Sequence, residues 1–489
     1  MAISVGYKSK AAFRISKRAN TYPITTAEAD TSRQILGKSD LIPMLSESLI
    51  HETRFDPDKV MGGQAGVTSL TKTALRGSGN ITLEGQYLGL DELIYAALGW
   101  EYAPILTATA AGYSGSPIFK EASGDDEEDV VASASGTTFV VAGTPFDYPD
   151  GICIGDYLRT EKRSAASEGN IVDQLVFRII SLNSASSAEV YPAIPNYIVA
   201  GDYVHIGRAF THTFECTKNI EEEAFTYGSA AGMYRVRHGT LCIDKTIDPI
   251  WEWRAVMVES MTIRLKSDQI VFEFGLVPFD LDRASSSNTA STTWQYSAMV
   301  NGSSVANYLQ ERMKFAQAVF RIKNYSTSSA LAAGDSLAIS EFELNFKNNL
   351  AADIAETKSG YYRAEPIRNG LREITGSFTI PRYQSDTLIN NYDDETLKMA
   401  DLVLTGSALT DCTSTNTFKL FLRSLKIIKA SPNIAGAGVT PIKFEFQCLQ
   451  PVGDPASMPS ETSGSDNSEI MIQTVNNNPF NAMMTQKNE

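Results

Sequence analysis

The chain has 489 residues, of which 43% are hydrophobic and 20% charged, and its formal net charge is −15. The length predicts two or three domains, and the composition is that of a folded protein and not of a disordered one. The acidic balance argues against a general nucleic-acid clamp, and no stretch approaches the roughly 18 uninterrupted apolar residues of a membrane span. No membrane partner is therefore expected, and the first 22 residues lack the apolar core of a signal peptide.

Residues 1–40 are polar and locally basic, without a sustained hydrophobic period, and predict an N-terminal arm that is loose alone and ordered by a neighbour. Its basic residues are Lys8, Lys10, Arg14, Lys17 and Arg18. A first domain begins at residue 41. Residues 80–86 alternate as a strand with Ile81 and Leu83 on one face and Glu84 on the other. Apolar residues at helical spacing follow over 90–98, and Gly99 is placed to end that helix.

Residues 103–208 read as an inserted domain. Between Pro104 and Arg208 there are 14 acidic and 6 basic residues, so more than half of the net negative charge lies here. The acidic run at 125–129 lacks the alternating ligands and the glycine of a calcium-binding EF-hand and indicates a solvated loop. Five short strand patterns, at 138–141, 156–159, 175–180, 188–191 and 202–206, predict a small β-barrel or sandwich.

The first domain resumes over 209–283, which makes it a split domain of 41–102 plus 209–283. Residues 284–317 are predicted to be a linker with a short helix, 318–452 a second domain, and 453–489 a tail that is rich in Ser, Asn and Pro.

The two domains share sequence patterns in the same order. The strand IVFEFGL at 270–276 recurs as IKFEFQ at 442–447, with Glu273 and Glu445 in equivalent places opposite a phenylalanine face. Residues 260–263 resemble 424–427, and residues 79–83 resemble 376–380. The offsets differ by 125 positions, as expected if the first copy holds the inserted domain. The chain therefore predicts an internal duplication.

No motif for chemistry stands out. The sequence has no HExxH, GxSxG, P-loop or GxGxxG pattern, its four histidines and five cysteines form no metal-ligand spacing, and no catalytic residue, cofactor or metal is expected. The acidic runs 221–223 and 393–395 read as exposed loops rather than as a glycosidase pair. Trp251 and Trp253 share one strand face, for which core packing is a commoner use than a sugar platform. The odd cysteine count indicates buried thiols and a reducing cytoplasm.

In this order, several features resemble the major tail tube proteins of long-tailed, non-contractile (siphovirus-type) bacterial viruses. They are the segment MLSESL at 44–49, the helix LDELIYAALG at 90–99, and the strand pair around 259–263 and 270–276. The second copy repeats the pattern at 342–350 and 373–378. The resemblance covers 41–102, 210–283 and 318–451. It implies a mainly β fold of two tandem tail-tube-type β-sandwich domains, each with a flanking short helix, together with the inserted β domain.

The resemblance also implies a structural protein of the virion tail, made and assembled in the bacterial host cytoplasm, whose rings stack into the conduit for DNA ejection. A chain with two copies needs only three subunits for a pseudo-sixfold ring. The expected partners are the chain itself, the tape measure protein and viral DNA in the lumen, and tail terminator and distal tail proteins at the ends.

Glu84, Glu273 and Glu445 are then candidate lumen-facing residues of a wall of mixed charge. The five basic residues of the arm, together with the linker and the tail, are candidate inter-ring contacts. The alternatives are another ring-forming tail or baseplate protein of the same fold and an extracellular carbohydrate-binding β protein.

Overall fold

The structure is a computed structural model. It describes residues 9–16, 23, 25–33, 36, 41–57, 69–106, 129–135, 138–141, 157–163, 171–184, 186–191, 203–205, 210–216, 237–245, 250–266, 269–283, 311–351, 361–382, 387–408, 415–432, 441–453, 455–456 and 468–476. The predicted linker at 284–304 lies outside the described residues.

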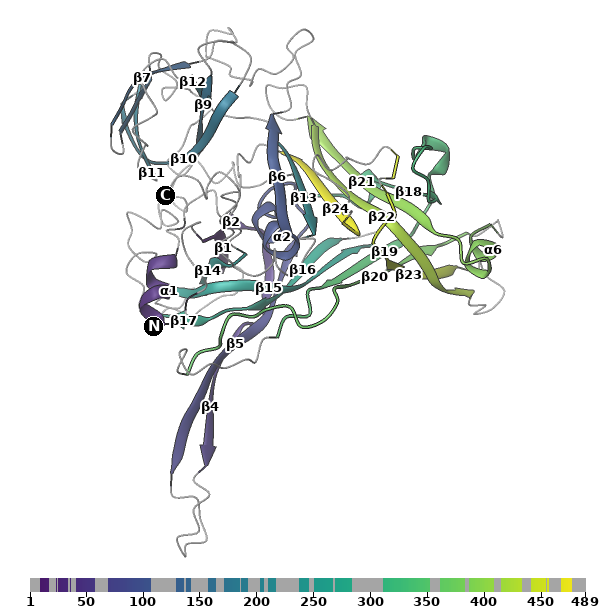
Figure 1. Cartoon of the computed structure of the whole chain (residues 1–489), viewed down its shortest axis with the longest axis horizontal. Helices are drawn as coiled ribbons and strands as arrows, with labels where there is room; N and C mark the ends of the chain where they lie inside the picture. Colours follow the sequence, from purple (N-terminus) through teal and green to yellow (C-terminus); the bar gives the residue numbers. More distant parts are fainter. Residues whose placement is uncertain are drawn as a thin grey trace, which may run out of the picture.

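One antiparallel sheet runs through both domains, and we call it the joint sheet. Its strands, in spatial order, are β3 (Met44–Glu47), β5 (Leu70–Glu84), β16 (Ile270–Val277), β15 (Trp251–Leu265), β19 (Glu341–Lys347), β20 (Glu373–Ile380), β23 (Ile442–Cys448) and the end of β22 (Thr415–Pro432). The order β5–β16–β15 in the first domain recurs as β20–β23–β22 in the second. The two domains meet where β15 pairs with β19 (Figure 1).

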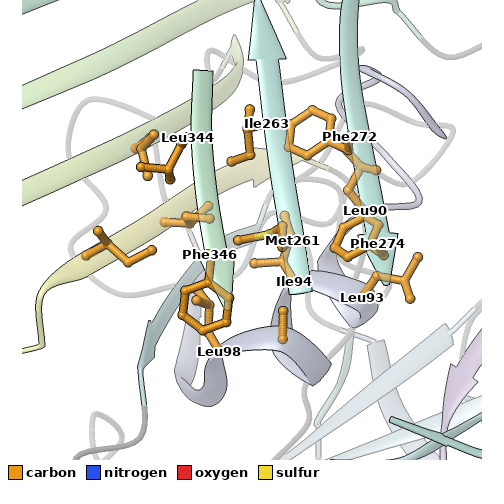
Figure 2. Close-up of a cluster of buried hydrophobic side chains, with 14 of the residues drawn as sticks. Leu90, Leu93, Ile94, Leu98, Met261, Ile263, Phe272, Phe274, Leu344 and Phe346 are labelled. Carbon is orange, nitrogen blue, oxygen red and sulfur yellow. The ribbon is translucent and has the colours of Figure 1, made fainter. Parts of the chain in front are cut away.

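The alternating sequence gives the joint sheet one apolar and one polar face. Phe272 and Phe274 are fully buried on β16, as Phe444 and Phe446 are on β23. Burying each such side chain stabilises the fold by about 1.5–3 kcal/mol. In the first domain the apolar face packs on helix α2 (Asp91–Leu98). Figure 2 shows leucine and isoleucine side chains of this helix near Met261 of β15 and Phe274 of β16.

Two further sheets cover the apolar side, and β15 and β22 are long enough to take part in both layers. The first outer sheet runs β2 (Leu41–Ile42), β1 (Lys10–Ile15), β14 (Gly239–Asp244), the start of β15, and β17 (Asp280–Asp282). The second runs β18 (Ala318–Asn324), β21 (Lys398–Ala408), the start of β22, β24 (Ile470–Asn476), β13 (Phe210–Cys216) and β6 (Gly99–Leu106). The prediction of a mainly β fold built from sandwiched sheets is thus confirmed.

Helices are short. Helix α2 ends at Gly99, as predicted, because that residue takes a left-handed φ of 91° that glycine adopts without strain. The second domain has the short helix α6 (Thr387–Asp393), as expected for each domain, and α1 (Thr26–Ser32) carries a capping box formed by Thr25 and Glu28. The helix expected within 305–316 is described only from residue 311, where two 3₁₀ turns follow in the chain, η5 (Phe315–Gln317) and η6 (Ala333–Asp335).

The inserted domain is a closed barrel, in agreement with the prediction of a small barrel or sandwich. Its strands in order are β10 (Ile171–Ser184), β11 (Ser187–Tyr191), β8 (Thr138–Val141), β7 (Asp129–Ser135), β12 (Tyr203–His205) and β9 (Tyr157–Arg163). Strand β7 was not anticipated, because it follows directly on the acidic run. Figure 1 shows the barrel beyond the ends of β6 and β13, from which the insertion departs.

A long hairpin projects from the first domain, formed by β4 (Ile50–Pro57) and the first part of β5 (Figure 1). In the second domain, the described part of the equivalent connection, between β19 and β20, forms an isolated antiparallel bridge between Leu350 and Arg368. Part of this connection, 361–372, lies against the base of the first domain's hairpin. The backbone N–H of Leu75 donates to the carbonyl of Tyr361 at 2.8 Å, and Arg363 donates to the carbonyl of Gly77 at 2.6 Å.

The described parts of 1–40 and 453–489 include strands, which differs from the expectation of loose segments. Strand β1 lies in the first outer sheet with Ala11, Ala12 and Phe13 buried, and β24 lies in the second with Ile470 and Ile472 buried. Each strand is short and sits in a polar neighbourhood of the sequence, so composition averaged over 40 residues does not reveal it.

Candidate functional site

The polar face of the joint sheet carries the three glutamates that the sequence singles out. Paired residues of neighbouring strands form two continuous rows across this face. One row runs Glu84, Val271, Arg264, Glu343, Ser377, Glu445 and Lys429. The other runs Ser46, Thr82, Glu273, Thr262, Asn345, Thr375, Gln447 and Lys426.

The structure supplies each of the three glutamates with a basic neighbour. Glu273 accepts from Arg264 at 2.8 Å and from Asn80 at 2.7 Å. Glu445 accepts from Lys429 at 3.3 Å, and Glu84 lies 3.1 Å from Arg312. These pairs are partly exposed, so each adds at most about 1 kcal/mol to stability. Their larger effect is on charge, because every predicted acidic site is neutralised locally.

The polar face as a whole is close to electrically balanced. Its strands carry six acidic residues, Glu84, Glu273, Glu341, Glu343, Glu373 and Glu445, and five basic ones, Arg264, Lys347, Lys426, Lys429 and Lys443. The expectation that this face is a lumen wall of mixed charge stays a prediction. The sequence shows the alternation that sorts charges to one face, but Arg312 escapes sequence reasoning because it lies in the segment that crosses between the domains.

The two ends of the joint sheet are open edges formed by different strands, one from each domain. At one end β3 pairs only with β5, and at the other the stretch 426–432 of β22 pairs only with β23, among the described strands. Each edge carries a large apolar side chain that is about half exposed, Leu45 on β3 and Ile428 on β22, both at 47%. Exposed strand edges with apolar side chains favour pairing with another chain.

The basic residues expected in the arm are separated by the structure. Lys10 and Arg14 lie on β1, where Arg14 is 5% exposed and its strand is paired on both sides. Lys8, Lys17 and Arg18 lie outside the described residues. The prediction of inter-ring contacts through this segment therefore stays a prediction.

Within the described residues, no group of three or more His, Cys, Asp or Glu side chains is placed to hold a metal ion. Over the same part of the chain, no helix is long and apolar enough to cross a membrane. Cys216, Cys242 and Cys448 are buried free thiols, and burial raises the pKa of Cys216 to about 12. That thiol is therefore protonated and unreactive at neutral pH.

Comparison with known proteins identifies the family of the chain. The family model for phage tail tube proteins matches residues 9–448, which is nearly the whole chain. The chain belongs to the phage tail tube protein family. A search of the curated proteins found no match. The resemblance seen in the sequence is thus confirmed, and this tail tube protein is a structural component of a phage tail, where it assembles with other tail components. The family is structural and not enzymatic.

Proposed function

We propose that three copies of this tail tube protein close into a ring with pseudo-sixfold symmetry, and that rings stack into the conduit through which viral DNA leaves the particle. The observation that carries this proposal is the junction inside the chain. There β15, the edge strand of the first domain's part of the joint sheet, pairs with β19, the edge strand of the second domain's part.

The same two kinds of edge remain open at the two ends of the joint sheet. Strand β22 occupies the place of β15 in the second domain, because it pairs with β23 as β15 pairs with β16. Strand β3 occupies the place of β19 in the first domain, because it pairs with β5 as β19 pairs with β20. A second copy can therefore continue the sheet by placing its β3 against 426–432 of the first. This contact is heterologous, so repeated copies make a closed ring or an open filament, according to the rotation at each step.

The stagger of the strands supports closure. Thr262 and Lys429 are equivalent, because each pairs with the central glutamate of its domain, Glu273 or Glu445. Yet Thr262 pairs with Asn345, whereas the row of Glu445 passes through Glu343. Equivalent rows are thus displaced by two residues from one domain to the next. A constant displacement of this kind is what a barrel of tilted strands requires. With eight strands per copy, three copies give a barrel of about 24 strands.

The polar face is the surface we assign to the lumen, with Glu84, Glu273 and Glu445 on it. Duplex DNA carries about one negative charge per 1.7 Å of its axis. A wall in which each of these carboxylates has a cationic neighbour neither holds the phosphates nor repels them strongly. Such a wall suits the transient, non-specific passage of DNA and of a tape measure protein. The apolar face is not available for this role, because it is buried against α2 and the outer sheets.

Stacking of rings needs a contact along the axis. The hairpin of β4 and β5 projects from the sandwich and exposes Ile50, Phe55 and Leu70 by 58%, 53% and 65% (Figure 1). We assign the axial contact to this hairpin, with the basic residues Lys8, Lys17 and Arg18 of the N-terminal segment as a second, salt-sensitive contribution. Long, even tubes of purified protein in electron micrographs distinguish a tube protein from another ring-forming tail or baseplate protein, which should give rings only.

The ring is tested by cross-linking its predicted joint. By the template of the internal junction, Ser431 of one copy lies opposite Ser46 of the next. A variant with Ser46→Cys and Ser431→Cys should form disulfide-linked species that end at a trimer on denaturing gels, because a closed ring leaves no further partner. A ladder that continues to six full chains, or no cross-link in assembled tubes, contradicts the proposal. The matched control pairs Ser46→Cys with Ser329→Cys, which is exposed away from both edges, and single variants control for the native thiols.

A further inference from the structure

The last described strand of the chain joins the two domains in the outer layer. Strand β24 pairs with β13 of the first domain along one edge and with β22 of the second along the other, antiparallel in both cases. Its residue Ile472 lies between Phe214 and Leu420. Without β24, these two strands would not belong to one sheet.

The groove that β24 fills is shaped for one extended segment. Ile470, Met471 and Ile472 are fully buried in it. At the start of the groove, the backbone N–H of Cys216 donates to the hydroxyl of Ser468 at 3.3 Å. The buried pair of Arg423 on β22 and Glu215 on β13, 3.5 Å apart, links the two walls directly at this end.

At the far end of the groove, side chains of the strand donate to a buried carboxylate and to a backbone carbonyl. Asp91, in the first turn of α2, is 1% exposed. It accepts from the hydroxyl of Thr474 at 2.7 Å and from the side-chain amide of Asn476 at 3.0 Å. The same amide donates to the carbonyl of Tyr87 at 3.0 Å. Leaving a buried carboxylate without such donors is unfavourable, so the site selects for these side chains in addition to main-chain pairing.

The strand lies apart from the rest of the fold in sequence. The family match ends at residue 448, at the end of β23, and β24 begins at residue 470. A stretch of the intervening chain is tied to the second domain, where Tyr325 donates to the carbonyl of Val452 at 2.9 Å and Ala456 donates to the carbonyl of Ser326 at 3.0 Å. The residues matched by the family model therefore form both walls of the groove but do not include the strand that fills it.

We propose that the groove between β13 and β22 is a binding site for one antiparallel β-strand, that residues 468–476 are its ligand, and that filling it fixes the orientation of the two domains. In the joint sheet the domains meet along the single strand pair β15–β19, which a twist can bend. A second strand connection in the outer layer removes that freedom. Since the angle between the domains sets the closure of the proposed ring, the ring should form only when the groove is filled.

The binding step is testable without any assembly. A protease site placed within 457–467 lets the intact chain fold before it is cut. A fluorescent peptide of residues 468–477 should then exchange into the nicked protein and saturate at one peptide per chain. The uncut protein should take up none, because its tethered strand has a high effective concentration. A peptide with Ile472→Asp should bind more than about tenfold more weakly, since it places a charge in an apolar site.

Two results overturn the strand site. Equal uptake by cut and uncut protein means that the peptide binds elsewhere. Equal affinity of the two peptides means that the groove does not recognise the apolar side chain at position 472. The consequence for the ring rests on the proposed function and has its own readout. Nicked protein cleared of its strand should lose the disulfide-linked trimer of the Ser46→Cys and Ser431→Cys variant and regain it with the native peptide. Trimers that persist with an empty groove would overturn the orienting role alone.

Discussion

At the scale of single residues, the sequence predicts which face of a strand a side chain occupies, but not which distant residue it contacts. The alternation around Phe272 and Phe444 was enough to place Glu273 and Glu445 on one polar face, because side chains of a strand point to alternate sides. The basic residues that pair with these glutamates could not be predicted from the sequence. Arg264 is nine residues from Glu273 and faces it only through the pairing of β15 with β16, and Arg312 reaches Glu84 across the chain.

A buried lysine gives a prediction at this scale. Lys398 on β21 is 2% exposed and donates to Asn324 at 2.5 Å. Burial lowers its pKa from the ordinary 10.5 to about 8. The unfolded chain therefore binds more protons than the folded one between about pH 8 and 10.5, and the free energy of unfolding should rise with pH across this window.

The variant Lys398→Met removes that group while keeping its volume. We expect it to be more stable than the wild type at pH 7 by about 1–3 kcal/mol, and the advantage to shrink as the pH approaches 10. Urea unfolding at several pH values measures the difference. Lys266→Met, at a lysine whose side chain is 58% exposed, is the control and should show no such trend. A constant advantage of Lys398→Met from pH 7 to 10 contradicts the assignment.

At the scale of elements, the recurrence of strands was correctly ordered but misaligned. The sequence match places Gly79 with Gly376 and residues 260–263 with 424–427. The pairing with the FEF strands instead makes Leu83 equivalent to Phe378, and Met261 equivalent to Ile427. Both matches are off by two residues. A slip of two keeps every side chain on its face, so the hydrophobic pattern cannot detect it, and in β22 a bulge after Ile427 adds to the ambiguity.

The close packing around residue 376 explains why a glycine occupies this position. A Cβ atom there would lie 2.4 Å from the ring of Phe446 and 2.6 Å from the carbonyl oxygen of Glu343. We expect Gly376→Ala to lower the free energy of unfolding by about 1–3 kcal/mol, because neighbouring strands would have to move apart. Gly334→Ala, where no atom lies within 4 Å of the added carbon, is the control. Equal unfolding midpoints in urea for the two variants would show that the close packing of β20 is not limiting.

For the whole molecule, composition and local patterns predict where short strands lie, but not which distant strands pair with one another. The strands of the barrel at 129–205 can be predicted from turn residues and short alternating segments, because the contacts within the barrel are local. The places of β1 and β24 depend on partners more than 200 residues away in the chain, such as Asp244 for Lys10 and His212 for Thr474. No local propensity encodes which sheet a six- or seven-residue strand will enter.

The barrel itself leads to the last prediction, which concerns assembly. The chain leaves the second outer sheet after Leu106 and returns at Phe210, and these two residues are direct partners across β6 and β13. A short turn can therefore close the two strands into a hairpin. The barrel is joined to the sandwich at the outer layer, away from the polar face and from both edges of the joint sheet. Deleting Thr107 to Gly207 with a short Gly/Ser bridge should leave ring and tube formation intact.

The deletion also removes 14 acidic and 5 basic residues, a net charge of −9, so tube assembly should become less dependent on salt as repulsion between neighbouring copies falls. Electron microscopy of tubes formed at low and high salt measures both effects. A matched variant that keeps the barrel but neutralises the acidic run at 125–129 separates charge from bulk. If the deletion variant folds with normal urea stability and yet forms no tubes, the barrel is a contact between subunits, and the prediction that it is dispensable for assembly is wrong.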